Sequence, residues 1–241
     1  MTNVSPAQRR IYQAAMRLFT EKGVTQLTIS DLAQEAGVAR GTVYSHVKST
    51  EHLFEQVASQ LSMEMHQRVS LSFVDIEDPA QRLANGVRAF IRRVHEEPQW
   101  GAFLGRFAMS NASLREMFYS QVAVDLLKGL SSKRYHFRQE QLASVISMVA
   151  GSTLGAMLLV REGIKTWRDA GSETAELLLL ALGISPVLAN TAQIKITKMG
   201  VPTDLPHENR VSQLAKNTDK QSVAATNRSE AGLDIPKSRK K

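Results

Sequence analysis

Residues 28–47 read TISDLAQEAGVARGTVYSHV, and this stretch decides the fold that the sequence predicts. Apolar residues recur in its first half at the spacing of one helix face: Ile29, Leu32, Ala33 and Ala36. Thr28 can cap this helix, and Asp31 completes a capping-box pattern. Gly37 follows, where a left-handed residue can end a helix without a Cβ penalty. A second short helix is predicted over residues 40–47, so the stretch has the plan of a helix-turn-helix motif.

The second of these helices carries side chains that suit contact with DNA. Val43 and Val47, four residues apart, form its buried side. The other side presents an arginine, short donors, an aromatic hydroxyl and an imidazole, with no acid among them: Arg40, Gly41, Thr42, Tyr44, Ser45 and His46. Gly41 is a poor helix former, but it would let the backbone approach DNA closely. Short helix pairs around a glycine also occur in plain helical bundles, so the pattern favours DNA binding while a structural role stays open.

The run from Thr28 to Leu53 resembles the N-terminal signature of the TetR family of bacterial one-component regulators. The features that match are the opening threonine, Ala-Gly-Val at 36–38, Gly-Thr-Val-Tyr at 41–44, the histidine at 46, and Glu51 with Leu53. Two positions depart, because the family usually has Phe where Val47 stands and Lys where Thr50 stands. The resemblance is specific over residues 6–53. Over residues 54–190 it is architectural, resting on the number, length and order of helices.

The resemblance implies an all-α fold of about nine helices. Residues 1–48 would form a three-helix helix-turn-helix domain, and residues 49–190 a helical regulatory, ligand-binding and dimerisation domain. The implied function is a homodimeric transcriptional regulator, expected to be a repressor that a small apolar ligand releases from a palindromic operator. The residues expected to contact DNA are Thr28, Arg40, Gly41, Thr42, Tyr44, His46 and Lys48. Arg40 and Thr42 would face base edges, and the side chains of Thr28, Tyr44, His46 and Lys48 would hold phosphates.

The distribution of charge agrees with a DNA-binding head. The net charge of the 241-residue chain is +7, of which residues 1–48 carry +3, residues 49–190 carry −1 and residues 191–241 carry +5. Residues 191–241 contain no aromatic residue and many polar ones, so we predict a disordered basic tail there. The N-terminus lacks the pattern of a secretory signal, and a cytoplasmic protein is expected.

An uncharged run over residues 141–160 has two interpretations. As a helix it would be about 30 Å long, enough to cross a bilayer. Five polar residues within it favour a buried or interface helix instead: Gln141, Ser144, Ser147, Ser152 and Thr153. We therefore expect no membrane span. A second apolar helix is predicted over residues 173–182, and the resemblance implies that the two helices pair across a two-fold axis. The expected dimer contacts are Gly151, Gly155, Leu177 and Leu180.

An apolar pocket is expected within residues 49–190, since ligand cavities are mostly apolar with few polar groups. The candidate pocket residues are Trp100, Phe103, Phe107, Met109, Met117, Phe118, Met148 and Met157. The same residue types at helical spacing are also typical of a plain core. An alternative function therefore stays open, in which the chain is a ligand-independent regulator or interaction protein whose helical core only dimerises or recruits a partner.

Residues with catalytic or metal-binding patterns are not evident in the sequence. The chain has no cysteine, which excludes thiol catalysis, disulfides and cysteine metal sites. Its six histidines are scattered, without a His-Glu-x-x-His pair, a phosphate-binding glycine loop or a Gly-x-Ser-x-Gly turn. We predict that the protein is not an enzyme and that it needs no metal or other cofactor. The expected partners are double-stranded DNA, a second copy of the chain and a small hydrophobic effector.

Overall fold

The computed structural model describes residues 5–73 and 75–185, and within them it contains nine α-helices, a 3-10 turn and no strand. This confirms the prediction of an all-α fold with about nine helices. The predicted tail at 191–241 lies outside the described residues. The helices are α1 Pro6–Lys22, α2 Ile29–Ala36, α3 Arg40–His46, α4 Thr50–Leu71, α5 Pro79–Glu96, α6 Pro98–Phe107, α7 Ala112–Ser131, α8 Leu142–Arg161 and α9 Trp167–Ala181, with the 3-10 turn at Gln139–Gln141 before α8.

Most helices begin where a short polar side chain can accept a hydrogen bond from the first turn. Ser5 accepts from the amide of Gln8 over 3.1 Å, and Ser49 accepts from the amide of His52 over 3.1 Å. Asp78, Asn111 and Thr166 cap α5, α7 and α9 in the same way. These caps satisfy amides that have no partner inside their own helix, and they fix where each helix starts.

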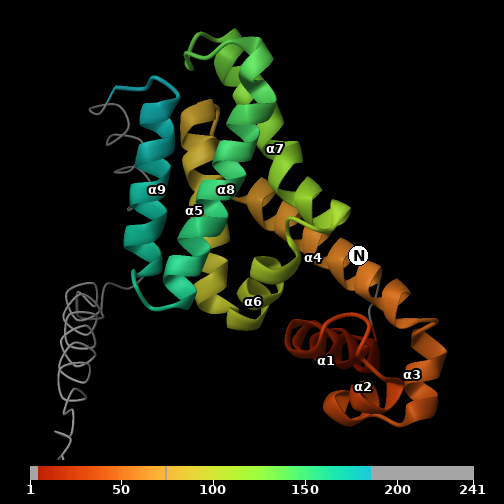
Figure 1. Ribbon diagram of the computed structural model, residues 1–241. Coiled ribbons are helices and arrows are strands. Elements are labelled where there is room, and N and C mark those ends of the chain that lie inside the picture. The colour runs from red at the N-terminus through yellow and green to blue at the C-terminus, as the bar shows by residue number, and fades with distance from the viewer. Residues whose placement is uncertain (1–4, 74, 186–241) are drawn as a thin grey trace, which may run out of the picture.

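Helices α1, α2 and α3 form a small head at one end of the molecule, and α4 leads from it into the larger helical body (Figure 1). The head has its own apolar core, which includes Ile11, Phe19, Leu32 and Val43, each 0% exposed. Phe54 on α4 lies edge-on to the ring of Phe19 on α1, with the centroids 5.2 Å apart. The head is therefore packed against the first turns of α4 and is not joined to it by a flexible linker.

The body is built around α5, which packs against α9, α8, α7, α6 and α4. Its largest fully buried side chains include Ile91, Trp100, Phe103 and Leu126. Helix α6 lies between body and head (Figure 1), and Arg106 at its end donates to the backbone oxygen of Thr20 near the end of α1. The head thus contacts the body through both α4 and α6.

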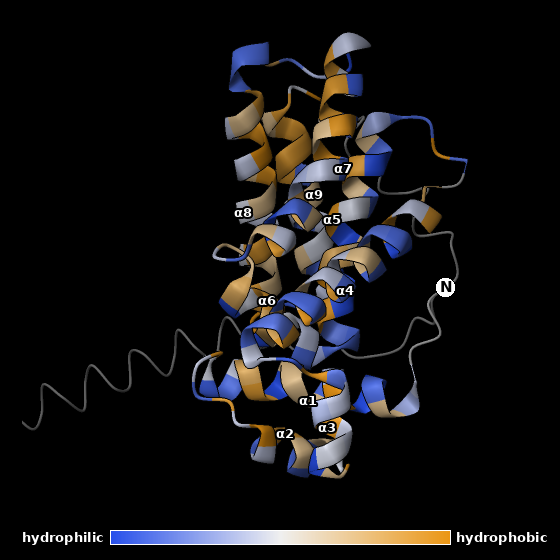
Figure 2. Ribbon diagram, turned by 90° about the vertical axis from the view of Figure 1, so that its right-hand side faces the viewer, coloured by the Kyte–Doolittle hydropathy of each residue, from blue (hydrophilic) through white to orange (hydrophobic). Residues whose placement is uncertain are grey.

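The uncharged run of the sequence forms α8, which lies beside α9 on the outside of the body (Figure 1). The helical stretch Gln139–Arg161 is long and apolar enough to cross a membrane by length and composition. Only 28% of its most apolar window is buried within the chain, and Figure 2 shows hydrophobic residues along much of α8. A core helix would bury more of its surface, so the described part of one chain leaves α8 with an exposed apolar face.

Candidate functional site

The stretch 28–47 forms two helices joined by a tight turn. The hydroxyl of Thr28 accepts from the amide of Asp31 over 3.1 Å, and the Asp31 carboxylate accepts from the amide of Thr28 over 3.2 Å, so the capping box is complete. Gly37 has the left-handed φ of 61° that the turn requires. Val43 is 0% and Val47 3% exposed, so these two residues hold α3 against the head.

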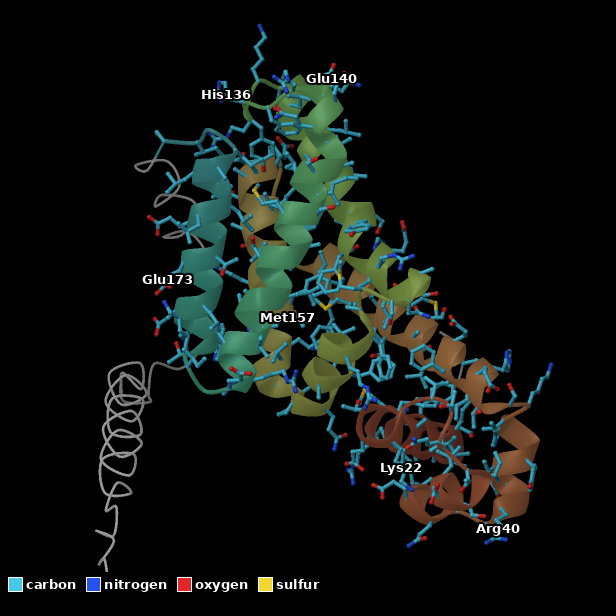
Figure 3. The ribbon with its side chains drawn as sticks, viewed as in Figure 1. Lys22, Arg40, His136, Glu140, Met157 and Glu173 are labelled. Carbon is cyan, nitrogen blue, oxygen red and sulfur yellow. The ribbon has the colours of Figure 1, made fainter. Side chains whose placement is uncertain are left out.

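The outward face of α3 carries the residues expected to contact DNA. Arg40, Gly41, Tyr44, Ser45 and Lys48 are exposed, while Thr42 and His46 are half-buried. Tyr44 keeps 67% of its surface in solvent, which is unusual for a large aromatic side chain. Arg40 lies at the end of the head farthest from the body (Figure 3). The face has no acidic residue to repel phosphate, and nothing else in the described chain covers it.

Thr28 stands apart from that face, because its hydroxyl is already part of the capping box. The nearby Asp31 carboxylate also pairs with Lys22, at 3.0 Å. The ammonium of Lys22 and then the Thr28 hydroxyl and amide hold the pKa of Asp31 below its ordinary value of 3.8. The N-terminus of α2 therefore already has an anionic partner, whereas Lys48, just before α4, is an exposed cation.

A cavity lies in the body between α4, α5, α7 and α8. The empty space among its lining atoms amounts to about 530 Å³, part of which is open to solvent. Most of its lining is apolar, and the polar side chains that reach it are few, as in pockets that bind small molecules. The lining residues are Met65, His66, Val69, Phe73, Arg82, Leu83, Gly86, Val87, Phe90, Met117, Phe118, Gln121, Val122, Asp125, Val149, Ala150 and Thr153.

Arg82 and Asp125 form an ion pair in the wall of this cavity. The Nε atom of Arg82 donates to Asp125 Oδ1 over 2.6 Å, and Gln121 donates to Oδ2 over 3.2 Å. The Asp125 side chain is 3% and that of Arg82 20% exposed. The guanidinium of Arg82 also lies 4.2 Å from the ring centroid of Phe73. Such a pair gives a mostly apolar cavity one polar region that can orient a ligand.

Two of the eight predicted pocket residues line this cavity. Met117 and Phe118 line the cavity, as expected, but the other six do not. Phe90, which lines the cavity, packs against both Phe118 and Trp100, with its ring centroid 4.6 Å from that of Phe118 and 6.1 Å from that of Trp100. Of the six, Trp100 and Phe103 are 0%, Met157 2% and Met109 59% exposed, and Phe107 and Met148 are partly buried.

The four residues expected at a dimer interface lie on the uncovered side of α8 and α9. Leu177 is 66% and Leu180 36% exposed. A Cβ atom added at Gly151 or Gly155 would meet no atom within 4 Å. Among residues 5–73 and 75–185 the two glycines therefore pack against no other helix, and they leave a flat strip that another helix can approach.

Two family models match the chain. Residues 11–57 match the bacterial regulatory proteins of the tetR family, and residues 78–193 match the tetracyclin repressor-like C-terminal domain. Together the two matches cover more than half of the chain. They correspond to the head with the start of α4 and to the body from α5 onwards.

Curated relatives are helix-turn-helix transcriptional regulators. An uncharacterised regulator of Mycobacterium tuberculosis is 28% identical over 97 residues, which are 40% of this chain and 48% of that protein, so the chain spans about half the length of this relative. The transcriptional repressor KstR2 of Mycolicibacterium smegmatis is 38% identical over 58 residues, which are 23% of this chain and 28% of that protein.

Solved structures share the fold over most of the chain. The fatty acid degradation regulator FadR from Bacillus halodurans has a TM-score of 0.63 at 18% identity, covering 73% of this chain and 95% of its own. FadR from Bacillus subtilis, in complex with stearoyl-CoA, has a TM-score of 0.61 at 18% identity, covering 71% and 97%. RolR, in complex with resorcinol, has a TM-score of 0.58 at 22% identity, covering 82% and 95%. With both family models matched, the chain belongs to the TetR family of bacterial helix-turn-helix transcriptional regulators.

Proposed function

We propose that this regulator is a homodimeric repressor, which a small, mostly apolar ligand releases from a palindromic operator. The observation that carries the proposal is the outward face of α3, which is exposed, free of acids and fixed by the buried Val43 and Val47. A helix presented in this way fits the major groove of DNA. In this proposal the head comprises residues 1–48, the regulatory and dimerisation domain residues 49–190, and the protein acts in the cytoplasm without a catalytic role.

The contacts to DNA divide into those that read bases and those that hold the backbone. Arg40 and Thr42, at the start of α3, face base edges, while Tyr44, His46 and Lys48 hold phosphates. Gly41 lets the helix backbone come close to the groove. Thr28 makes the weakest contribution, because its hydroxyl and amide are engaged with Asp31.

A gel-shift titration on an operator selected from random DNA tests these roles. Tyr44→Ala is expected to weaken binding about equally on all sequences, and Arg40→Ala to relax the preference at one base pair by roughly 1–3 kcal/mol. Lys48→Ala should reduce the slope of log affinity against log salt concentration by about 1, the value for one lost phosphate contact. If all three variants bind the operator like the parent, α3 is not the helix that enters the groove.

The dimer forms through the exposed apolar sides of α8 and α9. Pairing two copies across a two-fold axis would cover Leu177 and Leu180 and the flat strip at Gly151 and Gly155. This accounts for the exposed apolar surface of α8 without a membrane. A two-fold protein places its two heads on equivalent half-sites, and the operator is therefore expected to be palindromic.

The cavity is the proposed binding site of the releasing ligand. It is lined on one side by Met65, His66 and Val69 of α4, the helix that carries the head. A ligand that fills the cavity better in one position of α4 than in another would shift the distance between the two heads. Ligands of two relatives in complex, stearoyl-CoA and resorcinol, support a small-molecule role for this domain.

A further inference from the structure

The polar groups of the cavity are concentrated in the wall formed by Arg82, Gln121 and Asp125, on α5 and α7. Both carboxylate oxygens of Asp125 are occupied, Oδ1 by Arg82 Nε and Oδ2 by Gln121 Nε2. Arg82 uses only its Nε atom in this way. Among the described residues, no acceptor is hydrogen-bonded to its Nη1 or Nη2 atom, which together carry four N–H groups. This wall therefore has Arg82 donors to offer beside a carboxylate whose two oxygens each already accept one hydrogen bond.

The other polar residue buried in the cavity cannot supply a donor. Thr153 is 3% exposed, and its hydroxyl donates to the backbone oxygen of Val149 over 2.8 Å. His66 reaches the cavity from an exposed position on α4. The donors of the polar wall are thus the Nη groups of Arg82 and the second N–H of the Gln121 amide, which favours a ligand with a hydrogen-bond acceptor.

The charges around this wall are balanced. Arg82 compensates Asp125, and on the same end of the body Arg134 donates to both oxygens of Asp78, at 3.1 and 3.0 Å. A ligand carboxylate would be attracted by Arg82 and repelled by the adjacent buried Asp125, so the two effects largely cancel. What remains is the cost of removing the ligand's charge from water, which is much larger for an ion than for a hydroxyl. An ammonium would be attracted by Asp125 and repelled by Arg82, so the two effects largely cancel for a cation as well.

From these donors and charges we infer that the effector is a small uncharged alcohol or phenol with an apolar body. Its hydroxyl oxygen accepts a hydrogen bond from the Nη atoms of Arg82. The inference rests on the effector role of the cavity proposed above and specifies its chemistry. Arg82 is then the residue that determines specificity, and Asp125 positions its guanidinium.

Isothermal titration calorimetry of the full chain with phenol, toluene and benzoate tests the inference directly. The three probes share a ring and differ in their polar group. A hydrogen bond to a charged donor contributes about 1.5–3 kcal/mol, so phenol is expected to bind roughly 10- to 100-fold more tightly than toluene. Phenol should also bind more tightly than benzoate. Tighter binding of toluene or benzoate, or no binding of phenol, would overturn the inference.

Two variants separate the polar wall from the shape of the cavity. Arg82→Met with Asp125→Leu removes donors and acceptor together and leaves no unpaired charge, and it should reduce the preference for phenol over toluene to about threefold or less. Thr153 lines the same cavity, and the Thr153→Val variant should keep the parent's preference for phenol over toluene. A preference that survives in the double variant would exclude Arg82 as the recognising residue, provided that circular dichroism shows the variant to be folded.

The outcome is distinguishable from a failure of the proposed repressor function. Operator binding is measured without any probe, by the gel shift described above. If the protein binds its operator and the probes bind with another preference, only the effector chemistry is wrong. If phenol is preferred as expected and no operator is bound, the ligand preference of the cavity stands and the repressor function is wrong.

Discussion

Arg93 on α5 and Glu64 on α4 lie 3.0 Å apart, and this ion pair joins the helix that carries the DNA-binding head to the centre of the body. Arg93 also donates to Glu97 through Nε and Nη2, at 3.2 and 3.1 Å, and its guanidinium lies 4.5 Å from the ring centroid of Trp100. The arginine side chain is 2% exposed, while those of Glu64 and Glu97 are 42% and 36% exposed. The buried charge of the cluster is therefore the arginine.

The loss in the free energy of unfolding should depend on whether Arg93 or its two glutamate partners are replaced. Glu64→Gln with Glu97→Gln leaves the buried Arg93 without a counter-charge, and we expect a loss of about 3 kcal/mol in the free energy of unfolding. Arg93→Met leaves two half-exposed carboxylates that water can solvate, so its cost should be smaller, about 1 kcal/mol. Urea unfolding of the parent and of these two variants measures the difference in the free energy of unfolding. Glu96→Gln is the control, because Glu96 is similarly exposed and pairs with Arg92 and Arg68 but not with Arg93, and it should change stability by less than about 0.5 kcal/mol. Equal losses in both variants would contradict the argument.

Local sequence signals predicted the head well, because its caps and turns depend on residues a few positions apart. Thr28 with Asp31 and Gly37 are local signals of this kind, and the structure has the helix boundaries that they imply. The buried side of α3 also followed from spacing alone, since Val43 and Val47 are both in the core.

The position of the cavity could not be predicted from local sequence signals, because it depends on how helices that are distant in the sequence pack together. Arg82 and Asp125 are 43 positions apart, and each reads locally as an ordinary charged residue on a helix. The prediction chose Trp100 and Phe103 for their size and apolar character, which are equally the properties of a core residue. The structure separates the two kinds of aromatic residue at Phe90, which contacts both the cavity-lining Phe118 and the core residue Trp100.

Gly41→Ala should separate folding from DNA binding. A Cβ atom at this position would meet nothing within 4 Å in the free protein, and alanine is the better helix former by about 0.5–1 kcal/mol. We therefore expect the thermal midpoint to stay equal or to rise. If the backbone of α3 approaches DNA at Gly41, the same methyl group should reduce operator affinity by about tenfold. Thermal unfolding and gel shift on one preparation measure both, and because the two effects have opposite signs, misfolding cannot mimic them. Unchanged affinity would show that the groove leaves room at this position.

Gly155→Leu should weaken the dimer and leave each copy folded. The added side chain enters open space within one copy, yet it would obstruct a helix that lies across the strip at Gly151 and Gly155. Overpacking of a fitted contact costs about 1–3 kcal/mol, which corresponds to roughly a 5- to 150-fold rise in the dimer dissociation constant. Sedimentation equilibrium measures this constant. Ala156→Leu is the matched control, since Ala156 is 3% exposed and its replacement should destabilise the folded chain itself. A Gly155→Leu protein that dimerises like the parent would place the interface elsewhere.

The capping carboxylate of Asp31 should make the stability of the head depend on pH in the acidic range. Lys22 and then Thr28 lower its pKa below 3.8, so folding favours the ionised carboxylate. That contribution is present above the pKa of the unfolded chain and is lost as the pH falls through the lower, folded value. Asp31→Asn should therefore be less stable than the parent at about pH 6, and the two urea midpoints should converge towards about pH 2. Lys22→Met removes the first cause of the shift and should reduce the same difference. A gap between parent and Asp31→Asn that is constant across this range would mean that the side chain acts through its cap hydrogen bonds alone.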